Sequence, residues 1–158
     1  MYVVILYGFQ QQLRFNSDYE FNNPVGESGY SDSVKEKIVS FSRRIKEMNL
    51  RFHIGDYEEI DDLIDSDTLV YVDPPYLITL GSYNDGKRGF KGWDISEEQR
   101  LLSYLDVLIK RGCKVVISNL LEFNGLVNEF LQKWIDCHTV EILQTQYRKR
   151  NEHLIITQ

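Results

Sequence analysis

The four residues Asp73-Pro74-Pro75-Tyr76 have the clearest chemical potential in the sequence. Two consecutive prolines fix φ and remove two backbone N–H donors, which leaves a rigid corner rich in carbonyl groups. The Asp73 carboxylate and the Pro74 carbonyl could together accept both hydrogens of an exocyclic amino group on a nucleobase. Such a nitrogen is a poor nucleophile because its lone pair is delocalised into the ring. Holding its hydrogens favours the pyramidal form that can attack a methyl donor.

Tyr76 adds an aromatic ring that could stack on a base that has left the duplex. The alternative for the same four residues is a turn that ends a strand and has no chemical role. The apolar run before the motif and the tyrosine within it favour the chemical interpretation. The motif therefore predicts a site of methyl transfer to an amino group.

The elements predicted around this motif alternate between strands and helices. We expect strands at 50–54, 68–72, 114–118, 139–147 and 153–158, and helices from about 33 to 48, 57 to 64, 96 to 111 and 123 to 135. Residues 68–72 and 114–118 show no alternation of polar and apolar residues, which is typical of strands covered on both faces. This order favours a largely parallel sheet with helices on both faces and ligands at the carboxyl ends of the strands.

Capping residues predict where the helices begin and end. Ser33, with Glu36 three residues later, predicts the start of the first long helix, and Ser96 predicts the start of the next one. Gly112 is expected to end that second helix. Residues 123–135 have a helical apolar period that includes Leu126 and Val127.

Composition limits the class of protein. The 158 residues include 18 basic and 24 acidic side chains, a formal net charge of −6, and 42% hydrophobic residues, which suits one compact domain. Nine acidic residues and one basic residue lie between positions 51 and 86, where a solvated helix face and loop are the simplest interpretation. No apolar run approaches the ~20 residues that span a bilayer. No signal peptide is expected, and we predict a cytoplasmic chain without membrane contact.

Cysteine and histidine usage argues against a metal site. Cys113 and Cys137 are too few for a disulfide scaffold or a cysteine-based zinc cluster. His53, His138 and His153 show no ligand spacing. We therefore expect no metal ion. The Ser, Cys and His residues also form no recognisable arrangement for nucleophilic catalysis.

Five segments of the sequence resemble the Dam-like, α-order DNA adenine-N6 methyltransferases. They are GFQQQLRFNSDYEFNNPVG, FHIGDYEEI, LVYVDPPY, KVVISN and QYRKRNEHLIIT. The first resembles that family's DNA-recognition hairpin, the third its catalytic motif and the last its closing hairpin. The resemblance implies an α/β fold, namely a partial Rossmann-like class I methyltransferase sheet flanked by helices. That sheet would be mostly parallel with a closing antiparallel hairpin. Residues 1–30 would form the recognition segment and 31–158 the catalytic portion.

The resemblance assigns DNA contacts to five residues of the first segment: Phe9, Gln10, Arg14, Asn16 and Pro24. Arg14 would read a guanine edge in the major groove, and Pro24 would touch a base edge nearby. Phe9 and Gln10 would fill the stack left by the flipped adenine, although Gln10 replaces the asparagine expected there. The alternative for Arg14 is a surface ion pair with Asp18 or Glu20.

The resemblance also implies catalytic and cofactor residues. The catalytic residues would be Asp73, Pro74, Pro75 and Tyr76. Asp56 and Tyr57, together with Asp73, would bind S-adenosylmethionine, with the Asp56 carboxylate accepting from the N6 amino group of its adenine. The alternative for Asp56 is a helix N-cap, and both roles can hold at once.

The loop at 77–94 contains three basic residues: Lys87, Arg88 and Lys91. Glycine-bearing loops beside a site are often lids, and this one would place those cations on DNA phosphates. The alternative is a mobile surface loop with Trp93 in the core.

The glycine-rich cofactor strand of the family has no counterpart, because no Gly-x-Gly occurs in the sequence. The cofactor site is therefore expected to be incomplete in this chain. The strands that would neighbour residues 69–72 are also missing, which exposes an apolar edge. We expect the missing N-terminal half, a partner chain or self-association to cover that edge.

These observations predict a site-specific DNA adenine-N6 methyltransferase, or a fragment or subunit of one, that is inactive without its cofactor-binding part. Its partner would be double-stranded DNA. One alternative is a non-catalytic DNA-binding module, which needs Arg14 but not Asp73. A second is a methyltransferase for another amino group, in RNA or protein, against which the hairpin argues.

Overall fold

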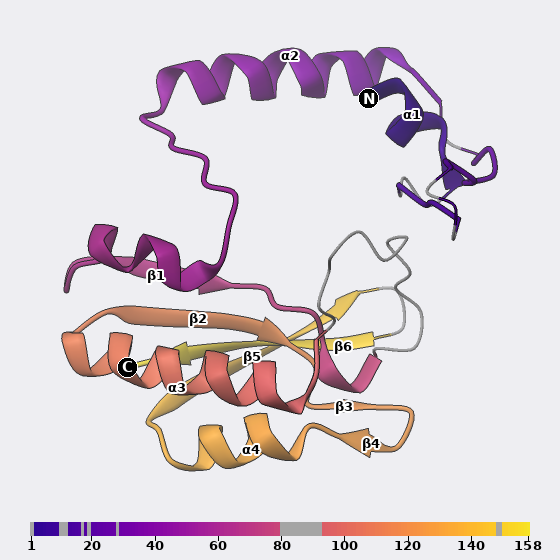
Figure 1. Ribbon diagram of the computed structural model, residues 1–158. Coiled ribbons are helices and arrows are strands. Elements are labelled where there is room, and N and C mark those ends of the chain that lie inside the picture. The colour runs from indigo at the N-terminus through magenta and orange to yellow at the C-terminus, as the bar shows by residue number, and fades with distance from the viewer. Residues whose placement is uncertain are drawn as a thin grey trace. The chain divides into compact units, whose positions relative to one another are not determined.

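The computed structural model describes residues 2–9, 13–16, 18, 20–27, 29–79, 93–147 and 150–158 (Figure 1). The chain divides into two compact units. The hairpin unit comprises residues 1–54 and 83–91, and the sheet unit comprises residues 55–82 and 92–158. Each is described by itself.

The hairpin unit begins with helix α1 (Tyr2–Tyr7), and antiparallel bridges follow it. Gly8 pairs with Val25, and Phe15 pairs with Phe21, whose rings meet edge to face with centroids 6.0 Å apart. These bridges form the irregular hairpin that the sequence predicts. Gly26 is required there, because a Cβ on it would lie 2.8 Å from the carbonyl oxygen of Gly8.

Helix α2 (Asp32–Glu47) follows the hairpin in the chain. Its N-cap is Ser31, whose side chain accepts from the N–H of Val34 at 3.3 Å. The predicted start at Ser33 is wrong by two residues, because a serine that can cap is already present before it. No residue of α2 is buried.

Residues 50–54 form no strand in the described structure, contrary to prediction. Phe52 and Ile54 are 83% and 98% exposed. Backbone in a strand needs a neighbour to bond its N–H and C=O groups, and no described segment supplies one here.

The sheet unit is built on four strands in the order β1-β2-β6-β5. They are β1 (Leu69–Val72), β2 (Lys114–Asn119), β5 (Val140–Tyr147) and β6 (Arg150–Thr157). β1 is parallel to β2, and β6 is antiparallel to both β2 and β5. The structure thus confirms the α/β class with an antiparallel closing hairpin.

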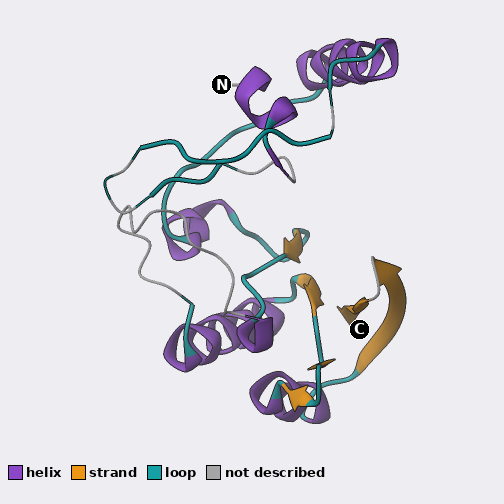
Figure 2. Ribbon diagram, turned by 90° about the vertical axis from the view of Figure 1, so that its right-hand side faces the viewer, coloured by secondary structure: helices purple, strands orange, loops and turns teal. Residues whose placement is uncertain are grey.

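Helices α3 (Ile95–Arg111) and α4 (Glu129–Asp136) pack on the strands through one buried core (Figure 2). Val115, Ile117 and Ile155 face these helices and are at most 1% exposed. On the opposite face of β1, Leu69 and Tyr71 are 65% and 60% exposed. Within the sheet unit the prediction that β1 is covered on both faces is therefore wrong.

The limits of α3 follow from its capping residues. The carboxylate of Asp94 accepts from the N–H of Glu97 at 3.0 Å, so the N-cap is Asp94 and not the predicted Ser96. Ser96 instead donates to Asp94 at 2.6 Å. Gly112 ends the helix with φ of 104°, as predicted, because glycine adopts this conformation without strain.

The helix predicted from residue 123 is wrong in its first turn and a half. Residues 122–127 form a tight hairpin of β3 (Glu122–Phe123) and β4 (Leu126–Val127). Asn124 and Gly125 turn the chain with φ of 52° and 79°, which this residue pair favours. Asn128 then caps α4 by accepting from the N–H of Leu131 at 3.1 Å.

Candidate functional site

The motif at residues 73–76, named here the transfer corner, follows β1 directly at the carboxyl end of the sheet. Asp73 is exposed, Pro74 is buried, and Tyr76 is half-buried. The Tyr76 hydroxyl donates to Asp73 Oδ1 at 3.3 Å and lies 3.1 Å from Ser118 Oγ on β2. Because β1 and β2 run parallel, their carboxyl ends meet and bring these three side chains together.

The backbone after the transfer corner is also fixed. The 3₁₀ helix η3 (Leu77–Thr79) follows, and both the N–H and the hydroxyl of Thr79 donate to the carbonyl of Tyr76, at 2.9 and 3.0 Å. Burial raises the pKa of Tyr76, and the Asp73 and Glu152 carboxylates raise it further, while the hydrogen bond with Ser118 lowers it. Tyr76 therefore keeps its proton at neutral pH and remains a donor to Asp73.

Asp56 and Tyr57, named here the cofactor corner, open the 3₁₀ helix η2 (Tyr57–Leu63). Asp56 Oδ1 accepts from the N–H of Glu58 at 3.1 Å, and Glu59 bonds back to the N–H of Asp56 at 3.1 Å. The structure therefore shows the N-cap that was the alternative role of Asp56. A cap and a cofactor contact are compatible, because a carboxylate has two oxygens and about four acceptor sites.

Arg100 on α3 also holds the cofactor corner. Its Nη2 lies 2.5 Å from Asp56 Oδ1, its Nε 3.0 Å from Glu58 Oε1 and its Nη1 3.0 Å from Glu97 Oε2. Its guanidinium also lies over the ring of Tyr57, 4.9 Å from the centroid. Sequence reasoning missed this residue, although an acidic helix beside one with regularly spaced arginines was a usable signal.

The acidic helix η2 is anchored to α3 along one face. Residues 100, 104 and 111 of α3 share that face at helical spacing. Arg111 binds both carboxylate oxygens of Asp61, at 3.0 and 2.8 Å, and Tyr104 donates to Asp61 at 2.9 Å. These bonds lower the pKa of Asp61, the bonds from Arg111 most. The segment is therefore a docked helix with specific partners, although its carboxylates remain partly solvated.

Tyr57 packs between these groups. Its ring lies 5.4 Å from that of Tyr104, and its hydroxyl is buried without a hydrogen-bond partner in the described structure. Burial raises the pKa of Tyr57 to about 12, although the charge of Arg100 lowers it. The phenol is therefore neutral and contributes mainly an aromatic surface.

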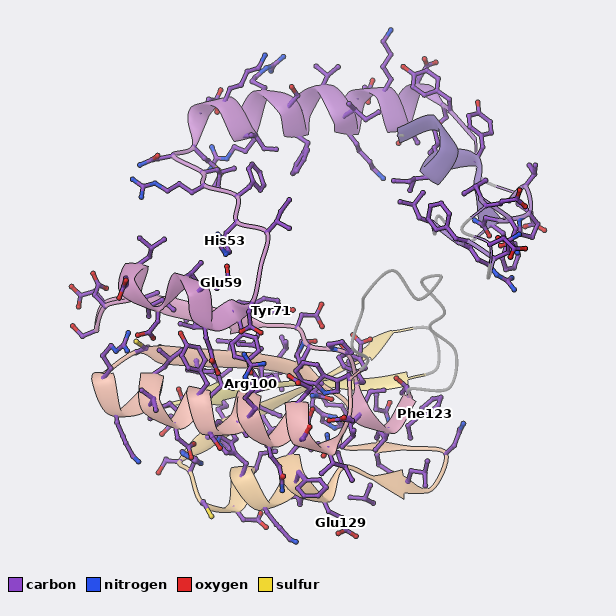
Figure 3. The ribbon with its side chains drawn as sticks, in the orientation of Figure 1. His53, Glu59, Tyr71, Arg100, Phe123 and Glu129 are labelled. Atoms are coloured by element: carbon purple, nitrogen blue, oxygen red, sulfur yellow. The ribbon has the colours of Figure 1, made fainter. Side chains whose placement is uncertain are left out.

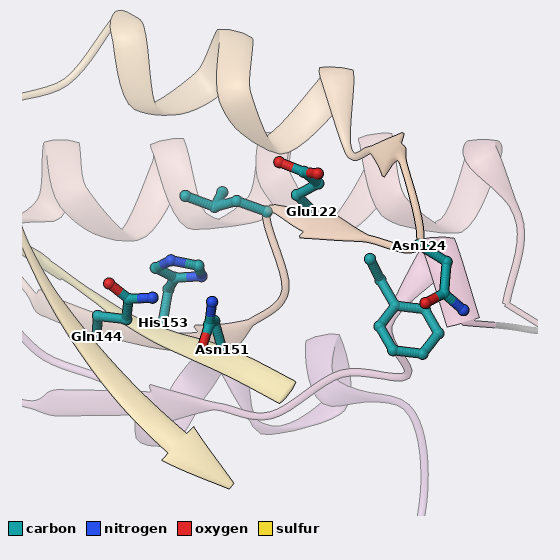
Figure 4. Close-up of a pocket in the computed structure, with 7 residues that line it drawn as sticks. Glu122, Asn124, Gln144, Asn151 and His153 are labelled. Carbon is teal, nitrogen blue, oxygen red and sulfur yellow. The ribbon is translucent and has the colours of Figure 1, made fainter. Parts of the chain in front are cut away.

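A pocket of about 440 Å³ lies between the β3–β4 hairpin and the β5–β6 pair (Figure 4). It is lined by Leu121, Glu122, Phe123, Asn124, Gln144, Asn151 and His153. Burial lowers the pKa of His153, and its Nδ1 is buried without a partner among the described residues. Across the β2–β6 pair, Ser118 is the partner of Leu154 and Asn119 is the partner of His153. Because successive side chains of a strand point to opposite faces of the sheet, His153 lies on the face opposite the Tyr76–Ser118 contact.

The hairpin unit contains the described members of the predicted DNA-contact set. The N–H of Phe9 donates to the carbonyl of Pro24 at 2.8 Å, which brings these two residues together. Arg14 is exposed, and within the described hairpin it forms no ion pair with Asp18 or Glu20, the alternative raised for it. Gln10, Lys87, Arg88 and Lys91 lie outside the described residues.

Asn16 has a structural role in this hairpin. Its Oδ1 accepts from the N–H groups of Asp18 and Glu20 at 3.0 and 2.8 Å, and its amide donates to Glu20 Oε2 at 3.2 Å. These bonds close the turn between Phe15 and Phe21. A DNA contact by the Asn16 side chain stays a prediction.

Metal-ligating side chains do not cluster among the described residues. These residues contain no group of three or more His, Cys, Asp and Glu side chains that could hold a metal ion. The thiol of Cys113 is buried and donates to the carbonyl of Asp65 at 3.1 Å. No helix in the described ranges is both long and apolar enough to cross a membrane.

The sequence is matched by a family profile described as D12 class N6 adenine-specific DNA methyltransferase, which covers residues 1–150. The chain belongs to this family. The match includes both the hairpin unit and most of the sheet unit, so the two regions are parts of one D12 class sequence.

Individual relatives agree with the profile. The type II methyltransferase M.FokI of Planomicrobium okeanokoites is 43% identical over 150 residues, which cover 93% of this chain and 23% of that protein. The modification methylase LlaI of Lactococcus lactis subsp. lactis is 42% identical over 139 residues, 87% of this chain and 22% of the relative. The DNA adenine methylase of Escherichia coli (strain K12) is 26% identical over 113 residues, 72% and 40% of the two chains. The chain thus spans less than a quarter of the first two relatives.

The residues of this D12 chain fit only part of S-adenosylmethionine. The cofactor corner presents a carboxylate acceptor and an aromatic ring, which suit the adenine end. The ten glycines of the sequence contain no Gly-x-Gly turn that could approach the methionine end.

Proposed function

We propose that this chain supplies the methyl-transfer and DNA-reading parts of an S-adenosylmethionine-dependent DNA adenine-N6 methyltransferase. The observation that carries the proposal is the transfer corner itself. Asp73 and Tyr76 are held at the carboxyl end of a parallel strand pair by hydrogen bonds that join β1 to Ser118 on β2.

In the reaction, the chain's residues prepare the amino nitrogen of adenine. The Asp73 carboxylate and the Pro74 carbonyl accept its two hydrogens, so that the lone pair points out of the base plane. When bound, the cofactor supplies an electrophilic methyl group on its sulfonium. Once methylated, the nitrogen would lose one proton, for which Asp73 is the adjacent acceptor.

Tyr76 would stack on the extrahelical adenine, because hydrogen bonds fix both its backbone and its ring hydroxyl. Its carbonyl accepts from Thr79, and its hydroxyl bonds to Asp73 and Ser118. A ring held in this way loses little conformational freedom when a base stacks on it. Asp56 and Tyr57 would contact the adenine of the cofactor.

The hairpin unit would read the DNA. Exposed Arg14 would bind guanine O6 and N7, with Phe9, Gln10, Asn16 and Pro24 in the same interface. Lys87, Arg88 and Lys91 would bind phosphates. A cytoplasmic location stays a prediction.

Among the described residues, nothing pairs with the outer edge of β1 or covers its outer face, which favours a partner there. β1 is the terminal strand of the sheet, and its exposed Leu69 and Tyr71 form an apolar surface beside unpaired backbone groups. We propose that a segment with the glycine-rich cofactor strand pairs with this edge, either from an N-terminal half or from a partner chain. Self-association through the same edge is the remaining possibility.

A second function is favoured by one observation, the absence of a Gly-x-Gly cofactor turn. The chain could be a DNA-binding module that keeps the hairpin but does not catalyse. This function needs Arg14 but does not need Asp73.

The test measures transfer of a tritiated methyl group to duplex DNA by the chain mixed with the glycine-rich segment of a relative. Asp73→Ala should abolish transfer and leave DNA affinity unchanged, with Asp136→Ala on the exposed end of α4 as a matched control. Transfer that persists in Asp73→Ala would refute the catalytic assignment. DNA binding without any transfer by the wild-type mixture would favour the non-catalytic module.

A further inference from the structure

Arg100 is the residue in the sheet unit that contacts both members of the cofactor corner. Its guanidinium forms an ion pair with Asp56 and lies over the ring of Tyr57. Arg100 extends from α3 (Figure 3) and lies 44 positions after Asp56 in the chain. Arg100 also pairs with Glu58 and Glu97, so it forms ion pairs with three carboxylates, whereas Arg111 on the same helix pairs with one.

We propose that Arg100 is a positioning residue for the cofactor, which sets the orientation of Asp56 and Tyr57 toward its adenine. The inference rests on the proposed function, in which these two residues contact that adenine. Arg100 would not touch the cofactor, but would act through the two residues that do.

The geometry explains why an arginine suits this task. A guanidinium is planar and presents five N–H donors in a fixed fork, so one side chain can bond three carboxylates and also stack on an aromatic ring. At Asp56 it bonds Oδ1, the same oxygen that accepts from the N–H of Glu58. These two donors, together with the N–H of Glu59 that completes the capping box, restrict rotation of this carboxylate.

The charges around Arg100 favour a persistent contact between Arg100 and Asp56. Asp56, Glu58 and Glu97 would repel one another without a cation among them. Hydrogen bonds from Arg100 to Asp56 and Glu58 raise the pKa of the guanidinium, so it stays charged throughout the accessible pH range. Arg100 is only partly exposed, with 37% of its side chain accessible, so solvent screens these pairs less than it would fully exposed ones.

Arg111 offers a matched control. Like Arg100 it extends from α3 to η2 and bonds an aspartate, and it also donates to the backbone carbonyls of Asp61 and Ile64. Removing either arginine weakens the docking of η2, but only Arg100 contacts the cofactor corner. A merely structural role would therefore show equally in both variants.

The experiment titrates S-adenosylhomocysteine by calorimetry into wild type, Arg100→Gln, Arg100→Lys, Arg111→Gln and Asp56→Ala. It uses the chain alone and the chain mixed with the glycine-rich segment of a relative. Arg100→Gln should weaken binding about tenfold, since a hydrogen bond to a charged group contributes on this scale. Arg100→Lys should fall between it and wild type, because lysine keeps the charge but not the fork. Arg111→Gln should stay within about twofold.

A second readout needs no cofactor. Hydrogen exchange of the Glu58 amide, which donates to Asp56 Oδ1, should accelerate in Arg100→Gln but not in Arg111→Gln. Unchanged exchange, or equal affinity losses in the two arginine variants, would overturn the role of Arg100. Affinity that survives Asp56→Ala, or no binding in either preparation, would instead overturn the cofactor assignment in the proposed function.

Discussion

The cofactor corner and the transfer corner each combine an aspartate with a tyrosine, but different groups hold their carboxylates. Asp56 is bound by the positive charge of Arg100. Asp73 is bound by the neutral hydroxyl of Tyr76, and no ion pair joins it to a described cation. A carboxylate without a cation partner remains a strong acceptor for amino hydrogens, whereas an ion-paired one is fixed in direction. The difference suits Asp73 to chemistry and Asp56 to recognition.

The largest expected effect separates the two aspartates by kinetics. In the complemented chain, meaning the chain mixed with the glycine-rich segment of a relative, Asp73→Asn should lower kcat by about 10²–10³-fold. This is the scale for losing one group that stabilises a transition state. Asp56→Asn should mainly raise the KM for S-adenosylmethionine, with kcat nearly unchanged, because it removes binding shared by ground and transition states. Steady-state methylation of duplex DNA measures both constants. A matching loss of kcat in both variants would mean that the two corners do not differ in role.

A smaller effect concerns the hydroxyl that joins the transfer corner to β2. Tyr76→Phe removes the hydrogen bonds to Asp73 and Ser118 and should lower the free energy of unfolding by about 0.5–1.5 kcal/mol. Urea denaturation of the chain gives this value. Ser118→Ala is the companion variant, and no loss in either one would show that this bond does not fix the corner.

The tyrosine of the cofactor corner should respond in the opposite direction. The Tyr57 hydroxyl is buried without a partner in the described structure, so Tyr57→Phe relieves a desolvation cost and should be neutral or stabilising by up to about 1 kcal/mol. The same denaturation series measures it. Destabilisation as large as that of Tyr76→Phe would mean that the hydroxyl has a partner.

The smallest expected effect is a dependence of thermal stability on pH in the acid range. Hydrogen bonds from Arg111 lower the pKa of Asp61 below its ordinary value of 3.8. The stabilisation from this pair is therefore complete above pH 3.8 and is lost as the pH falls below it, through the pKa of the folded state. Tm measured from pH 6 down to pH 2.5 should decline less in Arg111→Gln than in wild type. Parallel profiles for the two proteins would count against this pairing.

The transfer corner and its strands could be predicted because their signals are local. An apolar run followed by Asp73 and two prolines determines where β1 ends. The first residues of α2 and α3 could be predicted only to within two positions, because Ser31 and Asp94 compete with nearby serines that can also cap a helix. The turn at Asn124 was missed although its Asn-Gly pair is a local signal, because the apolar residues beside it also fit a helical period.

The fixed geometry of the cofactor corner could not be predicted in this way. The partner of Asp56 is Arg100, and only the packing of α3 on η2 brings them together. Likewise, the exposure of one face of β1 depends on which segments cover the sheet. An apolar run indicates that a strand should be buried, but it does not identify the covering segment.

One measurement tests most directly whether the transfer corner methylates adenine. Duplex DNA is incubated with S-adenosylmethionine and the complemented chain, digested to nucleosides and analysed by mass spectrometry, with Asp73→Ala in parallel. We expect N6-methyladenine in the wild-type digest and none in the Asp73→Ala digest. N4-methylcytosine as the product, or N6-methyladenine at equal levels with both proteins, would contradict the role assigned to this corner.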